Sequence, residues 1–379
     1  MSEALRCGDS SRGWRMLSPP QTLSDRTKSA AYASRDTVCT DHMVVVSWDD
    51  ETGWSDPELT AYGPLSLYPT ASCLHYATEC FEGMKVYAGD DGNLRLFRPS
   101  LNARRMGLSA GRISLPVPEA SELEKLIIAL IAVDGPRWLA GRPGSWMYLR
   151  PAMIGTHQQL GVAAPRQALL FITMSYMAPL HTVPGGMHLL TSSADTVRAW
   201  PGGFGYAKVG ANYGPSIPAL QTAQRAGFHQ VLWLYGSEGI CTEAGGSNLF
   251  FVWQRPQDGK RELITAPLDD NIILDGITRQ SCLELARERY GRDLVISERS
   301  YTINDVFKAS DEGRLEECFS AGTAYFICPI TRIQHRGVDI AISPGDVTTN
   351  MRNWLEDIQC GRIAHDWAVI VKPSTPSSG

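Results

Sequence analysis

Short apolar segments with the spacing of buried strands alternate with helix patterns along most of this chain. The predicted strands cover residues 43–48, 146–150, 168–174, 189–191, 230–235 and 248–253. One helix follows the capping box Ser121-Glu122-Leu123-Glu124 and runs to about Val133. Further helices begin near Pro215 and near Thr278. This order predicts an α+β protein of two domains with a cleft between them.

A turn-rich segment separates the two halves of the chain. Ala178 to Gly186 has no apolar period, so we interpret residues 179–186 as an interdomain linker. The smaller α/β domain then covers residues 37–178, and the larger domain covers residues 187–371. With 379 residues, the chain is long enough for two hydrophobic cores. Residues 1–36 and 372–379 lack periodicity, and we expect both segments to be flexible.

Charge and cysteine content narrow the possible partners and compartments. The net charge is −5 and no basic patch stands out, which disfavours nucleic acid as a partner. The longest apolar run, Leu126 to Val133, is too short to span a membrane. Nine cysteines without a Cys-x-x-Cys pair indicate reduced thiols and disfavour a zinc or other metal site. Glu3 and Asp9 disfavour a mitochondrial presequence, so we expect a cytoplasmic protein, with mitochondria left open.

Lys208 is the residue that most constrains the chemistry. The other six lysines, at positions 28, 85, 125, 260, 308 and 372, are interpreted as lying among polar neighbours or at element ends. Lys208 has no acidic residue within eight positions, and small, glycine and aromatic residues surround it. A lysine in a close-fitting pocket would be desolvated and partly neutral, as Schiff-base chemistry requires. A surface lysine on a glycine-rich loop explains this window equally well.

Two turns have the character of phosphate sites. Asp275-Gly276-Ile277-Thr278 precedes a helix, and a glycine followed by threonine at a helix start presents free backbone N–H groups. Ser320-Ala321-Gly322-Thr323-Ala324 is a small-residue turn that can also offer N–H groups to an anion. Taken alone, a plain helix cap and a hairpin turn remain the commoner interpretations.

An acid and an arginine complete the set. Glu243 precedes a glycine turn and an apolar strand, so its carboxylate could face a cationic ring nitrogen, or it is a solvated turn acid. Arg105 could clamp a phosphate, whereas we interpret Arg104 as an exposed helix residue. One lysine, two phosphate-type turns, one arginine and one acid together indicate pyridoxal phosphate. No phosphate loop or dinucleotide fingerprint is present.

Ordered matches from about Thr37 to Val371 carry a family resemblance. The matching stretches are Thr40–Met43, Leu74–Ala77, Phe81–Lys85, Arg95–Phe97, Leu149–Pro151, Val197–Trp200, Gln230–Gly236 and Asp357–Gln359. The chain resembles eukaryotic branched-chain amino acid aminotransferases, which are fold type IV pyridoxal phosphate enzymes. The resemblance implies a two-domain fold with the cofactor in the interdomain cleft, held by the larger domain.

The resemblance also implies a role for each matching residue. Lys208 would bind the cofactor covalently and move the proton, Tyr213 would bond the phenolic oxygen, and Glu243 would hold the ring nitrogen protonated. The phosphate would be held by Arg105, Ile277, Thr278 and Thr323. The substrate pocket would contain Phe81, Tyr148 and Ala324, with Arg150 admitting 2-oxoglutarate or glutamate. Tyr76 would reach the site of a partner subunit, which implies a homodimer.

Four departures from the family concern the substrate pocket and redox control. Cys39 stands where relatives have phenylalanine, Leu180 where they have tyrosine, and Gly246-Ser247 where they have Thr-Met. Tyr325 and Cys328 occupy the positions of a Cys-x-x-Cys pair, so no redox switch of that kind is expected. We therefore expect transamination between a branched-chain or related hydrophobic L-amino acid and 2-oxoglutarate. A D-amino acid aminotransferase, an aminodeoxychorismate lyase and a non-catalytic paralogue remain as alternatives.

Overall fold

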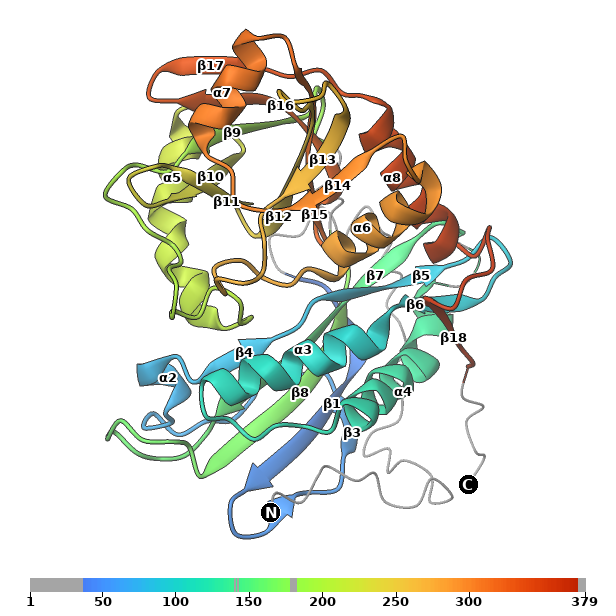
Figure 1. The fold of residues 1–379 in the computed structure, drawn as a ribbon. Coiled ribbons are helices and arrows are strands. Elements are labelled where there is room, and N and C mark those ends of the chain that lie inside the picture. The colour runs from blue at the N-terminus through green and yellow to red at the C-terminus, as the bar shows by residue number, and fades with distance from the viewer. Residues whose placement is uncertain (1–36, 140, 142, 178–182, 374–379) are drawn as a thin grey trace. The chain divides into compact units, whose positions relative to one another are not determined.

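The computed structural model describes residues 37–139, 141, 143–177 and 183–373 (Figure 1). These residues divide into two compact units. The first holds residues up to 177, Ala207–Gly210, and those from Asp357 onward. The second holds residues 183–206 and 211–356. The expected flexible segment 1–36 and Leu180 lie outside the described residues, as do most of the tail and part of the expected linker.

The first unit is built on one sheet, in which nine strands are described. The strand order is β18-β6-β5-β7-β8-β1-β2, and β3 and β4 pair with β1 and β7. The strands are β1 (Cys39–Asp49), β2 (Gly53–Trp54), β3 (Glu58–Ala61), β4 (Glu79–Phe81), β5 (Met84–Ala88), β6 (Leu94–Phe97), β7 (Trp146–Gly155), β8 (Gln167–Ser175) and β18 (Ala368–Val371). Its helices are α2 (Cys73–Tyr76), α3 (Pro99–Arg112) and α4 (Ala120–Leu139). Figure 1 shows α3 and α4 side by side, and α4 packs on β1, β7 and β8.

Helix α4 differs from its prediction at both ends. It begins at Ala120, and the Glu119 carboxylate accepts hydrogen bonds from the Ser121 hydroxyl and from the Glu122 N–H, the latter at 2.9 Å. Ser121 is therefore inside the first turn, and its assignment as the capping residue is wrong, because Glu119 reaches back over that turn. The helix continues past Val133 to Leu139 because Trp138 and Leu139 are buried.

The second unit contains another sheet of nine described strands, with the order β11-β10-β9-β16-β15-β12-β13-β14 and β17 on β16. The strands are β9 (Met187–Thr191), β10 (Gln230–Tyr235), β11 (Ile240–Ala244), β12 (Ser247–Gln254), β13 (Arg261–Thr265), β14 (Val295–Glu298), β15 (Leu315–Gly322), β16 (Phe326–His335) and β17 (Val338–Ala341). Its helices are α5 (Ile217–Arg225), α6 (Ile277–Tyr290) and α7 (Ile303–Asp311), and α8 (Asp346–Gln359) begins in this unit. Two short 3₁₀ turns, η1 (Gly210–Asn212) and η2 (Gly214–Ser216), precede α5.

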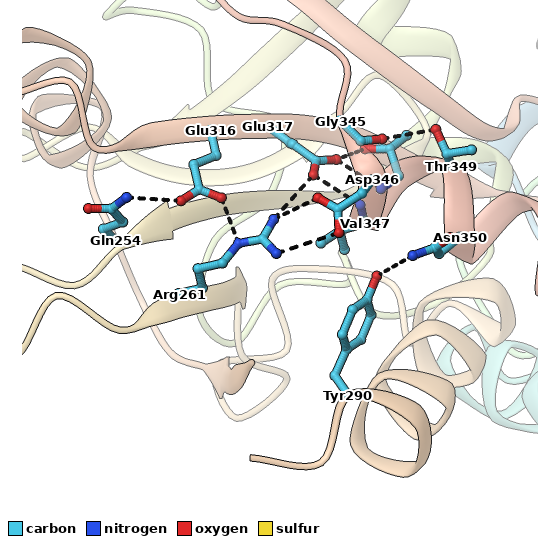
Figure 2. Close-up of polar contacts among 11 residues, drawn as sticks. Gln254, Arg261, Tyr290, Glu316, Glu317, Gly345, Asp346, Val347, Thr349 and Asn350 are labelled. Atoms are coloured by element: carbon cyan, nitrogen blue, oxygen red, sulfur yellow. Dashed lines mark hydrogen bonds and ion pairs between the residues drawn. The ribbon is translucent and has the colours of Figure 1, made fainter. Parts of the chain in front are cut away.

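A charged network fixes the start of α8 against the sheet (Figure 2). The carboxylate of the buried Glu317 accepts hydrogen bonds from the N–H groups of Val347 at 3.0 Å and Thr348 at 2.8 Å. It thereby satisfies two donors of the first helical turn. Arg261 on β13 donates to Glu316 at 2.7 Å and to Asp346 at 2.8 Å. The Arg261 guanidinium holds the pKa of the Asp346 carboxyl below its usual value.

All six predicted strands are confirmed, and most extend beyond the predicted residues. The helix predicted near Pro215 is divided into η2 and α5. The helix near Thr278 begins at Ile277. None of the helices in the described part of the chain is long and apolar enough to cross a membrane.

Candidate active site

Lys208 belongs to a four-residue segment that is hydrogen-bonded to the first unit. Its N–H donates to the Ser109 hydroxyl on α3 at 2.8 Å, and its carbonyl accepts from the Phe81 N–H at 3.0 Å. The neighbouring Val209 forms a β-bridge with Cys80 on β4. The backbone on both sides of the lysine is therefore fixed. The side chain is partly buried, and Nζ lies 4.8 Å from the centroid of the Phe81 ring.

Gly210 ends this segment, and the packing explains why a glycine stands there. A Cβ atom at position 210 would lie 1.6 Å from Oε1 of Glu79. Any larger residue would force the Glu79 side chain to move, because its carboxylate already occupies the space. The glycine-rich sequence around Lys208 thus permits close contact with β4.

Arg105 is held by a buried acid of the same unit. Its Nε and Nη2 atoms donate to the two oxygens of Glu82 at 2.8 and 2.9 Å. Asn102, one turn earlier on α3, donates to Glu82 at 2.8 Å. The neighbouring Arg104 is exposed, as predicted. The proposed phosphate ligand Arg105 therefore has a fixed side-chain orientation.

The predicted pocket residues Phe81, Tyr148 and Arg150 are in contact. The Arg150 guanidinium lies 4.5 Å from the Phe81 ring centroid and donates from Nη2 to the Tyr148 hydroxyl at 3.1 Å. A Cβ atom at Gly83 would lie 2.0 Å from that hydroxyl, so the glycine leaves room for the tyrosine. The buried Arg150 Nε has no hydrogen-bond partner among the described residues. A guanidinium that packs against aromatic rings, with one N–H group that has no partner among the described residues, suits an anionic ligand.

Cys39 and Tyr76 lie elsewhere in the first unit. Cys39 begins β1 opposite Ser175, which pairs in turn with Tyr148. Burial raises the pKa of the Cys39 thiol, and a hydrogen bond with Tyr62 partly offsets that effect. Tyr76 ends α2, is exposed, and donates its hydroxyl proton to the carbonyl of Leu160.

In the second unit, Glu243 is a buried acid with a fixed orientation. It is 3% exposed and lies on β11. One carboxylate oxygen pairs with Arg198, and the other accepts from Asn248 at 3.4 Å and from the Leu274 N–H at 3.3 Å. The interpretation as a solvated turn acid is therefore wrong, because the strand buries the side chain among charged and polar partners.

The predicted phosphate turn at the start of α6 adjoins the same acid. Gly276 is the N-cap, and no side chain caps the helix. Asn248, which contacts Glu243, also donates to the Leu274 carbonyl at 2.9 Å, and its Oδ1 would lie 1.9 Å from a Cβ at Gly276. The uncapped N–H groups of Ile277 and Thr278 can donate to an anion. One asparagine thus joins the acid to the predicted phosphate turn.

The second predicted phosphate turn is a hairpin between β15 and β16. Thr323 and Ala324 lie in its turn, so the hairpin interpretation is confirmed. The neighbouring Ser320 has a buried hydroxyl oxygen without a hydrogen-bond partner among the described residues. A hairpin does not exclude anion binding, because turn N–H groups remain available.

Tyr213 and Gly246, predicted for cofactor and substrate, are neighbours. A Cβ atom at Gly246 would lie 3.7 Å from Cε1 of Tyr213, an ordinary van der Waals distance. Gly246 is exposed and Tyr213 is partly buried. A Cβ atom would therefore fit at position 246 without moving the tyrosine.

Lys85 corrects one sequence interpretation. The sequence pattern groups it with the lysines in polar surroundings, but it lies inside β5 and is only 4% exposed. Its amine lies 3.8 Å from the centroid of the Trp146 ring, and burial lowers the pKa of the amine to about 7. The apolar neighbours Met84 and Val86 are the signal that could have identified it.

Sequence reasoning gave no role to several residues that orient the site. These are Ser109, Asn102, Glu82, Arg198 and Asn248. Glu82 had a usable signal, because an acid between Phe81 and Gly83 interrupts an apolar run. The others depend on contacts between distant positions, which a single sequence does not reveal.

The chain is similar to a family of known enzymes and to several of its members. The family model of class IV amino-transferases matches residues 79–333. The mitochondrial branched-chain-amino-acid aminotransferase of Schizosaccharomyces pombe is 41% identical over 342 residues, covering 88% of this chain and 79% of the relative. The cytosolic enzyme of Mus musculus is 41% identical over 335 residues, covering 87% of this chain and 86% of the relative.

Solved structures with the same architecture include two branched-chain amino acid aminotransferases. That of Thermobaculum terrenum in its PLP form has a TM-score of 0.69 at 24% identity, covering 88% of this chain and 99% of that one. The T.th. enzyme, complexed with N-(5′-phosphopyridoxyl)-L-glutamate, has a TM-score of 0.67 at 25% identity, covering 86% of this chain and 98% of that one. These likenesses confirm the predicted α+β, fold type IV class.

Proposed function

The chain belongs to the class IV aminotransferases, and we propose that it exchanges an amino group between a hydrophobic L-amino acid and 2-oxoglutarate. The products would be the 2-oxo acid and glutamate. The donor would be a branched-chain amino acid or a related one, because the relatives on which the proposal rests are named for branched-chain substrates. The cofactor would be pyridoxal phosphate, and the T.th. enzyme's complex with a phosphopyridoxyl-glutamate adduct supports both the cofactor and glutamate.

The observation that carries the proposal is the connection of Glu243 to the start of α6 through Asn248. A buried acid suits a protonated ring nitrogen, and an uncapped helix start suits a phosphate. Pyridoxal phosphate carries both groups on one rigid ring. Glu243 and the start of α6 therefore match the ring nitrogen and the phosphate of that cofactor in charge and in hydrogen-bonding character.

When bound, pyridoxal phosphate supplies an electron sink for charge at the substrate Cα. Lys208 would hold the cofactor covalently, and its Nζ would take the proton from Cα and deliver it to C4′. Glu243 would keep the proton on the ring nitrogen, with Arg198 fixing the carboxylate. Tyr213 would bond the phenolic oxygen. The phosphate ligands would be Arg105, Ile277, Thr278 and Thr323.

The substrate would meet residues with distinct tasks. Arg150 would bind the carboxylate of the dicarboxylic partner, since its Nε has no partner within the described chain. Hydrophobic side chains would contact Phe81, Tyr148, Ala324, Gly246, Cys39 and Leu180. We further propose a homodimer, in which Tyr76 reaches the site of the partner subunit. We propose a cytoplasmic location, and the relatives include both cytosolic and mitochondrial enzymes.

The direct test begins with the purified protein incubated with pyridoxal phosphate. After desalting, the protein should retain a visible absorption band, and Lys208→Ala should lose its covalently held cofactor. A panel of L-amino acids with 2-oxoglutarate should then yield glutamate from hydrophobic donors. A colourless protein, or a coloured one that produces no glutamate from any donor, would contradict the proposal.

A further inference from the structure

Glu82 is a fully buried carboxylate that no role in the proposed reaction accounts for. It follows β4 directly and is 0% exposed. Its Oε1 accepts from Arg105 Nε at 2.8 Å. Its Oε2 accepts from Arg105 Nη2 at 2.9 Å, from Asn102 at 2.8 Å and from the Gly83 N–H at 3.2 Å.

Burial of a carboxylate is costly unless its charge is compensated. Burial alone would raise the pKa of Glu82, but the charge and hydrogen bonds of Arg105, the charge of Lys208 and the amide of Asn102 hold it below the usual value. The carboxylate is therefore ionised. It lies in the field of both Arg105 and Lys208, two cations that the proposed reaction uses.

The geometry of the pair sets the direction in which Arg105 faces. Glu82 takes the Nε–Nη2 edge in a two-pronged contact, which is the most directional pairing available to a guanidinium. The Nη1 side is consequently the edge turned away from the acid. Asn102 and Arg105 lie on α3 at a spacing of three residues, so one face of this helix carries both of these donors to Glu82.

We propose that Glu82 is a positioning residue for cofactor binding: it fixes the guanidinium of Arg105 in the orientation that receives the cofactor phosphate. This inference rests on the proposed function. Glu82 touches neither cofactor nor substrate in this scheme, and it acts through Arg105. Its effect should therefore depend on the phosphate group and on Arg105 itself.

The test compares two aldehydes that differ only in the phosphate. Dissociation constants of pyridoxal phosphate and pyridoxal are measured on the cofactor-free full-length protein from the visible absorption band. Glu82→Gln, which keeps the shape and removes the charge, should weaken pyridoxal phosphate binding by about tenfold or more. Pyridoxal binding should change by less than about threefold, since it lacks the group that Arg105 holds. Glu124→Gln, a partly buried acid on α4, is the matched control and should change neither constant.

A double-mutant cycle then tests the dependence on Arg105. Adding Glu82→Gln to Arg105→Gln should cause no further loss of phosphate preference. If Glu82→Gln does not fold, Asn102→Ala removes one donor to the same carboxylate and should reduce the phosphate preference in the same direction. Equal losses for both aldehydes in either variant, or additive losses in the cycle, would overturn the inference. Failure of the wild-type protein to bind pyridoxal phosphate would instead refute the proposed function.

Discussion

Phe81 and Lys208 are joined both through the backbone and through the side chains. The Phe81 N–H donates to the Lys208 carbonyl at 3.0 Å, and the lysine Nζ lies 4.8 Å from the centroid of the phenylalanine ring. The amine is thus fixed next to an aromatic residue of the predicted pocket. This arrangement ties the proposed reactive amine to β4 rather than to a loop.

Replacement of Lys208 by Ala should abolish the covalently held cofactor and nearly all transamination, because both the covalent and the proton-transfer roles disappear. Absorption spectra and initial rates with leucine and 2-oxoglutarate measure the two effects. Lys260→Ala is the matched control, since Lys260 is exposed and distant in sequence from Lys208. If Lys208→Ala keeps turnover within tenfold of wild type, Lys208 is not the residue that holds the cofactor and transfers the proton.

Glu243→Gln should leave the protein folded but slow the chemical step. Gln cannot keep a proton on the ring nitrogen, and loss of one such electrostatic partner typically costs about 2–4 kcal/mol in the activation free energy. The measurement is kcat at saturating substrate. Glu238→Gln, in the exposed turn five residues earlier, should behave as wild type. An unchanged kcat would mean that Glu243 has only a structural role.

Lys85 should make stability rise with pH. Its amine has a pKa of about 7 when folded and an ordinary value of 10.5, so the unfolded chain binds more protons between these values. The free energy of unfolding should therefore increase as pH rises from 7 toward 10.5, by up to about 1.4 kcal/mol per pH unit. Lys85→Met should flatten that slope in urea titrations at several pH values. Lys125→Met, on the exposed side of α4, should keep it. Equal slopes in wild type and Lys85→Met would show that the amine titrates normally.

The pocket departures should broaden substrate choice. The family resemblance implies that Cys39, Leu180 and Gly246 replace larger residues, so longer or aromatic donors should react alongside leucine. Gly246→Thr is the variant to use, because a Cβ at this position would lie at an ordinary van der Waals distance of 3.7 Å from Tyr213. Alone or with Leu180→Tyr, it should shift kcat/KM toward leucine relative to phenylalanine by about tenfold or more. A ratio that stays constant would show that neighbouring segments already close the pocket.

Mild peroxide should not switch this enzyme off reversibly. Cys328 is fully buried, burial raises the pKa of its thiol to about 11, and Tyr325 stands at the position where a second cysteine would be needed. The thiolate required for oxidation is therefore scarce at neutral pH. Activity is measured after peroxide and again after dithiothreitol. A reversible loss that disappears in Cys328→Ser would contradict this expectation.

Local patterns predict the strands well because burial leaves a direct trace in the sequence. The strand Gln230–Tyr235 is predicted to the residue, and the start of α6 is located from one glycine and one threonine. The cap of α4 is not predicted correctly. A serine followed by glutamate three positions later has the pattern of a capping box whether or not Glu119 precedes it. Short-range chemistry alone cannot choose between competing caps.

The orienting residues could not be found in the same way. Arg198 and Glu243 are 45 positions apart, and Ser109 and Lys208 are 99 apart. The two residues of each pair meet only after the sheets have formed, so the pairing leaves no periodic pattern in the sequence. The candidate reactive residues are recognisable because their residue types are unusual among their sequence neighbours, whereas the residues that orient them are ordinary polar residues.

The placement of Ala207–Gly210 has a consequence for how this protein could be divided or recombined. The segment groups with the first unit, whereas Tyr206 and Ala211 on either side group with the second. A fragment ending at the expected linker would lack Lys208 and also β18, which pairs with β6 at the sheet edge. Gene exchange by a single crossover at the linker would likewise separate the amine from the strand that anchors it. A chimera that swaps the first unit between relatives therefore has to carry this segment and β18 along with it.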